Sequence, residues 1–127
     1  MNDSMQCRAV KVLVDGSATI VDLGDDTLAA LRTEIGCQWV DVIRFPGSLD
    51  CWIDDEGAVL ADARVNFVVT VLARSVGMNW QQYYGTGLFA NHDADGNTVG
   101  LSEVEADGLV LAARAICERV AAQQPSS

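Results

Sequence analysis

The sequence predicts an α+β fold in which three helices pack on a small antiparallel or mixed sheet within a single compact domain. Two observations carry this prediction. Runs of β-branched and aromatic residues, separated by turn-forming residues, indicate strands, and three segments with helical spacing each follow a capping residue. The chain has 127 residues, 50% of them hydrophobic. This is enough for one domain over 1–127, with an ordered part of about 7–122 between short flexible ends.

The first elements follow from local turn and cap signals. Two β-prone runs flank the Asp-Gly dipeptide at 15–16, which accepts the positive φ angles of a tight turn, and predict a hairpin over residues 10–23. Asp25 or Asp26 can then cap a short helix, and Gly36 is placed to end it.

A second group of strands is predicted in the middle of the chain. Residues 37–45 carry apolar side chains on both alternating faces, which predicts a strand in the centre of its sheet. Residues 49–53 and 58–60 flank the acidic segment 54–57, and predict a second hairpin whose charged tip lies in water.

The segment 66–76 fits two structures, because its run of Phe, Val and Thr would suit a strand equally well. Asn66 as a cap, apolar residues at helical spacing and Gly77 as a stop favour the helix. An aromatic, Gly-rich loop follows over 78–87, and loops of this kind often carry function. Beyond it, residues 88–101 predict a strand, a polar turn and a short strand.

The C-terminal helix has the clearest signal. Ser102 and Glu105 form a capping box. One apolar stripe is predicted along the helix: Val104, Leu111, Ala112, Ala115, Ile116 and Val120.

The charge of the chain restricts its partners. Eight Lys and Arg against eighteen Asp and Glu give a formal charge of −10, which opposes binding to nucleic-acid phosphates and anionic lipids. We therefore expect neither direct nucleic-acid binding nor membrane binding. The acidic residues can serve solubility alone, or they can imitate a phosphate backbone and occupy a DNA-binding partner.

Several other features predict a cytoplasmic protein without a metal. The N-terminal residues lack the pattern of a secretory signal, and the sequence contains no apolar stretch of membrane-spanning length. The four cysteines are widely spread and form no Cys-x-x-Cys pair. We expect them to behave as small hydrophobic residues.

No catalytic constellation is predicted. His92 is the single histidine of the chain, and no nucleophile motif accompanies it. Residues 91–97 resemble the start of a calcium loop, but Ser102 occupies the position where such a loop needs a bidentate Glu. A hairpin turn explains the same residues. The sequence therefore predicts no catalytic residue, no metal and no cofactor.

The candidate binding residues surround the helix at 66–76 and the aromatic loop that follows it. Flat aromatic side chains can stack on a base or anchor an interface, and arginines can neutralise a phosphate. The predicted ligand-binding residues are Arg64, Asn66, Arg74, Trp80, Tyr83 and Tyr84.

The order of these segments resembles the uncharacterised family called domain of unknown function 3846, whose members are found widely in bacteriophages and their hosts. The matching stretches are the opening hairpin and helix, residues 36–44, 51–57, 85–89 and 95–101, and the helix at Asn66. Family members commonly have an Asn-Pro-x-Ala-Thr stretch where this chain reads Asn66-Phe67-Val68-Val69-Thr70, so the proline is missing.

The resemblance implies an α+β domain of phage or mobile-element origin and supplies no activity. We expect a non-enzymatic accessory protein that binds a nucleotide-like small ligand or a host protein, in counter-defence, as a homo-oligomer. One rival is an acidic DNA mimic that inhibits a host nuclease or DNA-binding protein. A second rival is a hydrolase that uses His92 or an acidic metal site, and a third is a structural role within the phage.

Overall fold

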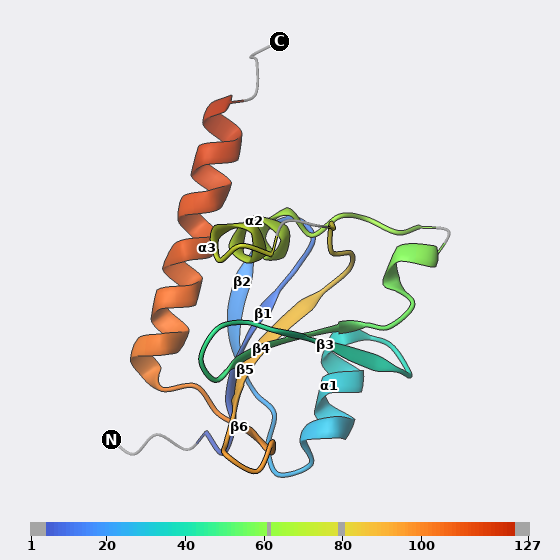
Figure 1. The fold of residues 1–127 in the computed structure, drawn as a ribbon, viewed down its shortest axis with the longest axis vertical. Helices are drawn as coiled ribbons and strands as arrows, with labels where there is room; N and C mark the ends of the chain where they lie inside the picture. Colours follow the sequence, from blue (N-terminus) through green and yellow to red (C-terminus); the bar gives the residue numbers. More distant parts are fainter. Residues whose placement is uncertain (1–4, 61, 79–80, 124–127) are drawn as a thin grey trace.

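Six strands form one open antiparallel sheet in the structure, a computed structural model that describes residues 5–60, 62–78 and 81–123 (Figure 1). The strands are β1 (Arg8–Val12), β2 (Ala18–Asp22), β3 (Val40–Arg44), β4 (Leu49–Asp54), β5 (Gly87–His92) and β6 (Thr98–Val99). Their order is β2-β1-β5-β4-β3, and β6 pairs with β5. Every pairing is antiparallel, so the sheet is the antiparallel one of the two predicted types.

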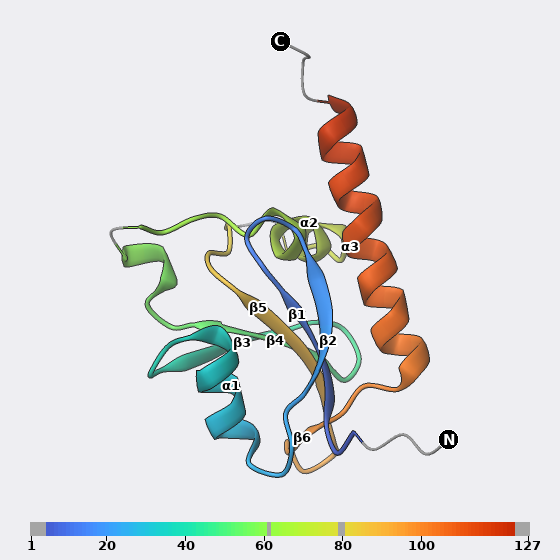
Figure 2. The ribbon, with the colours of Figure 1, turned by 180° about the vertical axis from the view of Figure 1, so that it is seen from behind.

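Helices cover both faces of the sheet. Helix α1 (Thr27–Ile35) lies on one face, and α2 (Phe67–Ser75) and α3 (Glu103–Gln123) lie on the other (Figures 1 and 2). A single 3-10 turn, η1 (Gly57–Val59), follows β4. The predicted α+β class and the three helices packed on a sheet are confirmed over the described residues.

The core is divided between the two faces because side chains alternate along each strand. On the central strand β5, Leu88 and Ala90 pack with Leu31 of α1. Phe89 points to the opposite face and packs with Val69 of α2. The Phe89 ring also contacts Phe45 edge to face, with ring centroids 5.5 Å apart.

Local signals placed the first hairpin and the caps of the helices correctly. The turn between β1 and β2 contains Gly16 at a φ of 93°. Asp26 caps α1 by accepting a hydrogen bond from the Ala29 N–H, and Gly36 ends it in the left-handed conformation. The segment 66–76 is a helix, as predicted, with Asn66 as its cap.

Two strand predictions are wrong. The strand within 37–45 was predicted to be central, but β3 pairs only with β4 and forms an edge. Apolar residues occur on both faces of β3 because α1 packs on one face of the sheet and α2 on the other. Residues 58–60 form no strand: η1 occupies 57–59, and β4 pairs with β3 and β5 instead.

The apolar stripe predicted for α3 is also partly wrong. The capping box is confirmed by two reciprocal hydrogen bonds between Ser102 and Glu105, at 2.8 and 3.1 Å. Ile116 is buried as predicted, but Val104 and Leu111 are exposed. The small residues Ala106 and Ala113 take their place against the sheet. Within the described part of the chain, no helix combines the length and the apolar character needed to span a bilayer.

Candidate functional site

The loop after α2 borders two cavities in its described part. Met78, Gln81 and Tyr83 line a cavity of about 320 Å³ next to the edge strand β3. Gly85 and Thr86 line a second cavity of about 240 Å³ on the side of α1 and η1. The segment that the sequence indicated as functional therefore contacts both cavities, but no single cavity gathers all of its described residues.

The first of these, which we call the Tyr83 cavity, combines an apolar lining with a few polar groups. Its lining residues are Asp41, Val42, Ile43, Arg44, Ile53, Met78, Gln81 and Tyr83. Binding sites for small molecules commonly have this composition, in which apolar contacts supply area and convergent polar groups fix the orientation. Arg44 is the one cation among these residues, and its side chain is 58% exposed.

Tyr83 is held firmly in the core. It is 3% exposed, its N–H donates to Thr70 Oγ1 at 3.1 Å, and its carbonyl oxygen accepts from the Asn66 N–H at 2.8 Å. Burial, and secondarily the Cys51 thiol, raise the pKa of the Tyr83 phenol. The phenol consequently stays neutral at physiological pH and can act as a hydrogen-bond donor.

The predicted binding residue Asn66 is occupied within the fold. Its Nδ2 donates to the carbonyl oxygens of Val12 at 3.0 Å and Gly85 at 2.9 Å, and its Oδ1 accepts from the Val69 N–H at 3.1 Å. The residue as a whole is 1% exposed. Asn66 thereby ties the start of α2 to β1 and to the loop before β5.

The two predicted arginines lie at opposite ends of α2. Arg64 precedes the helix and lines the second cavity, where Asp54 and Asp62 also lie. Arg74 is exposed in the last turn of α2. Tyr84 is half-buried, and its hydroxyl donates to Gln82 Oε1 at 3.4 Å. Trp80 lies outside the described residues.

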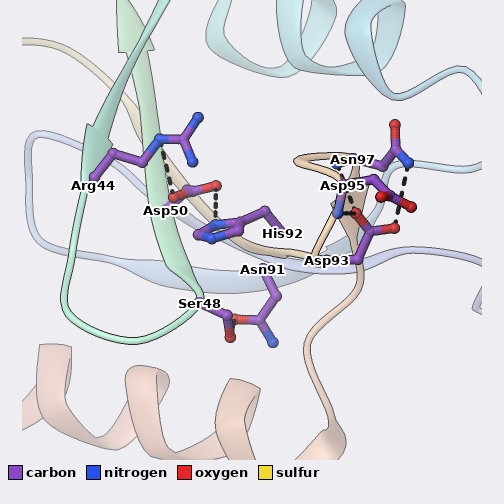
Figure 3. Close-up of polar contacts among 8 residues, drawn as sticks. All are labelled: Arg44, Ser48, Asp50, Asn91, His92, Asp93, Asp95 and Asn97. Atoms are coloured by element: carbon purple, nitrogen blue, oxygen red, sulfur yellow. Dashed lines mark hydrogen bonds and ion pairs between the residues drawn. The ribbon is translucent and has the colours of Figure 1, made fainter.

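A hydrogen-bonded Asp–His pair that the sequence did not indicate lies on the α1 face of the sheet. The Asp50 side chain is 2% exposed, and its Oδ2 lies 3.0 Å from His92 Nδ1. Its Oδ1 has no hydrogen-bond partner and lies 3.7 Å from Arg44 Nε. Figure 3 shows these three side chains on one side of the strands, with Asn91 and Ser48 on the other.

The pair forms because strand register brings β4 and β5 together. Asp50 pairs with Ala90 across the ladder, so His92, two residues further along β5, shares its face. An aspartate and the imidazole whose Nδ1 it orients are two of the three members of a hydrolytic triad. Among the residues that the structure describes, no Ser, Thr or Cys side chain hydrogen-bonds to Nε2, so the third member of a triad is missing from this part.

The resemblance of residues 91–97 to a calcium loop is explained by a turn. Asp93 Oδ1 accepts hydrogen bonds from the N–H groups of Asp95 and Asn97, at 3.0 and 2.9 Å. The Asn97 hydrogen bond, first among several, lowers the pKa of the Asp93 carboxyl. Within the described ranges, no group of three or more His, Cys, Asp or Glu side chains could hold a metal ion.

Comparison with known proteins identifies the family. No curated protein and no solved structure matches the chain. A family model described as "Domain of unknown function (DUF3846)" matches residues 7–111, which span β1 to the middle of α3 and include both cavities and the Asp50–His92 pair. The chain therefore belongs to the DUF3846 family.

Proposed function

We propose that this protein is a non-enzymatic accessory protein of phage or mobile-element origin that binds a small planar ligand of the nucleoside or mononucleotide class. Its place of action is the cytoplasm of a bacterial host, where such a ligand would be a signal in a defence response. The Tyr83 cavity carries this proposal, because its apolar lining is joined by an amide, a carboxylate and a guanidinium.

The size of the cavity limits the ligand. Its volume of about 320 Å³ lies at the lower end of the range for small-molecule sites, so one ring system with a sugar fits better than a dinucleotide. Ile43, Ile53 and Met78 offer apolar contacts and a thioether to the flat face of a base. The Gln81 amide and the Tyr83 phenol supply hydrogen bonds for its polar edge.

The charge of the chain limits the ligand further. Asp41 and Arg44 give the lining residues one formal charge of each sign, and the whole chain carries −10. A polyanion would be repelled at a distance. One phosphate beside Arg44 is the largest negative charge that this arrangement favours.

Native mass spectrometry with a panel of nucleosides, mononucleotides and cyclic mononucleotides tests the proposal. We expect one class of compound to be retained. Gln81→Ala and Tyr83→Phe should each weaken its binding by about tenfold, the worth of one good hydrogen bond to a polar ligand. Gln82→Ala is the matched control, because Gln82 is exposed beside the cavity and does not line it.

Two outcomes would overturn the proposal. A bare protein mass with every compound of the panel would exclude this ligand class and favour a host protein as the partner. A retained compound that is lost on Arg64→Ala, but not on Gln81→Ala, would move the binding site to the second cavity.

A further inference from the structure

The outer face of α3 is apolar at its centre although it contacts no other described element. We define this face by Val104, Gly108, Leu111 and Ala115, which recur at helical spacing. Val104 is 81% exposed and Leu111 is 60% exposed, and Gly108 and Ala115 are also exposed. Large aliphatic side chains at such exposure on a single helix face are typical of an interaction surface.

The position of α3 leaves this face open. Ala106, Ala113 and Ile116 are buried on the opposite side of the helix. Figures 1 and 2 show α3 along one flank of the molecule, with the sheet and α2 on one side of it. A second long helix can therefore lie along the outer face without meeting the rest of the domain.

Two unpaired charges flank the centre of this face. Asp107 lies four residues before Leu111 and Arg114 three residues after it, and both are exposed. Neither has an ion-pair partner within the residues that the structure describes. Because a helix rises about 1.5 Å per residue, the two charges lie about 6 Å and 4.5 Å from Leu111 along the axis, in opposite directions.

We propose that a second copy of this chain packs its α3 antiparallel on this face, around a two-fold axis at Leu111. The antiparallel arrangement brings Asp107 of each copy to nearly the height of Arg114 of the other, on the same side of the interface. The same face then serves both copies, as a two-fold symmetric interface requires. Opposite charges meet twice, and the Leu111 side chains meet at the axis.

Small residues and like charges set the strength of this contact. Apart from the adjoining backbone of its own helix, Gly108 has no described neighbour within 4 Å of the position where a Cβ would lie, so it and Ala115 allow the two helices to approach closely. Near the ends of the interface, Glu118 of one copy comes to the height of Glu103 of the other. This repulsion adds to the net charge of −10 on each copy, so the dimer is expected to be weak and to dissociate on dilution.

Sedimentation velocity over a concentration series tests the proposal. The intact chain should move from 13.6 kDa towards twice that mass as its concentration rises. Leu111→Lys should raise the dissociation constant at least about tenfold. Leu28→Lys is the matched control, because Leu28 of α1 is 48% exposed and lies on another helix.

Charge reversal distinguishes the proposed geometry from any other dimer. Asp107→Arg and Arg114→Asp should each weaken association several-fold, because each places like charges together. The chain carrying both changes should dimerise as the original does. Glu118→Lys should strengthen the dimer, because the new cation meets Glu103 of the other copy.

Three results would overturn the proposal. The first is a single 13.6 kDa species at every concentration. The second is a dimer that Leu111→Lys leaves unchanged, and the third is a double charge reversal that fails to restore association. Far-ultraviolet circular dichroism of each variant shows that the fold is retained, which is expected because all the changed side chains are exposed.

Discussion

Replacing Asn66 tests the internal connection between α2, β1 and the loop before β5. Asn66→Ala removes the helix cap, worth about 1 kcal/mol, and two hydrogen bonds to carbonyl oxygens, worth about 1 kcal/mol each. The three contacts are those to Val69, Val12 and Gly85. We expect the free energy of unfolding to fall by about 3 kcal/mol, a large share of the 5–15 kcal/mol typical of a domain.

Asn66→Asp is a more specific test, because it keeps the helix cap and replaces the N–H donor by an acceptor oxygen. The carboxylate can still accept from the Val69 N–H, but its second oxygen faces the carbonyl oxygens of Val12 and Gly85. A buried charge that faces acceptors costs several kcal/mol. At about pH 7 this variant should be less stable than Asn66→Ala, by roughly 1 kcal/mol or more.

The pH dependence of Asn66→Asp follows from the same burial. Burial disfavours the charged form, so the folded-state pKa of the introduced carboxyl is raised above its unfolded value. A raised folded-state pKa gives stability that is lost as the pH rises through it. The deficit of Asn66→Asp should therefore shrink between about pH 7 and about pH 5, whereas that of Asn66→Ala should not.

Urea unfolding followed by circular dichroism measures both effects. An equal dependence of the unfolding free energy on urea concentration in each variant shows that the unfolded state is unchanged. If Asn66→Asp is as stable as Asn66→Ala at about pH 7, or if its deficit is constant with pH, Asn66 does not act as a donor to two buried carbonyls. A loss below about 0.5 kcal/mol for Asn66→Ala would refute the whole assignment.

Three further predictions concern stability. His92→Ala should cost about 3 kcal/mol, because it leaves the buried Asp50 carboxylate with one partner at 3.7 Å; adding Asp50→Asn should recover part of this loss in a double-mutant cycle. At Gly16, where φ is +93°, an added Cβ would lie 2.7 Å from a ring carbon of Phe67, so Gly16→Ala should cost more than about 2 kcal/mol. Gly96→Ala is the control, because φ is +85° there but the space is open, and it should cost about half as much. Urea midpoints that rank the two variants in the other order would contradict this. Hydrogen bonds from backbone N–H groups, that of Cys7 first, lower the pKa of Asp22 from its ordinary 3.8. The carboxylate therefore stabilises the fold above pH 3.8, and this stabilisation is lost as the pH falls through the lowered folded-state pKa. In an acid titration, Asp22→Asn should lose less stability than the original chain.

The elements that were predicted correctly depend on neighbours in the sequence. Asp26 and Gly36 bound α1, and Ser102 and Glu105 begin α3, through hydrogen bonds within a few residues. Asn66 likewise decided between helix and strand for the segment that became α2. Caps are local chemistry, so a sequence can specify them without knowledge of the tertiary fold.

The errors arise where long-range pairing decides the outcome. The edge position of β3 depends on β5 pairing with β4, and residue 49 meets residue 91 in that ladder. On α3, the buried positions include Ala106 and Ala113, which give a weak apolar signal, whereas the larger Val104 and Leu111 face outward. Hydrophobic periodicity alone therefore found only part of the buried side of this helix, namely Ile116 and Val120.

The candidate site was predicted only in part. The aromatic loop drew attention to Tyr83, which lines one cavity. The position of Arg64 beside the predicted helix drew attention to that arginine, which lines the other. The Asp50–His92 pair was missed because its members lie 42 positions apart in the chain and meet only through strand register. A signal was present: Asp50 is a carboxylate directly flanked by the apolar Leu49 and Cys51 in β4, and a buried carboxylate needs a partner.

The central place of β5 has a consequence for how the chain folds. Residues 8–22 and 40–54 can each form a local hairpin early, but β5 must enter between them to join β1 to β4. Until residue 92 has been synthesised, both hairpins expose unpaired edges, which are templates for association with other chains. Contacts of such sequence separation slow folding. Nascent chains that stop short of β5 should therefore aggregate, and insertion of this one strand should be the step that joins the two hairpins into one sheet.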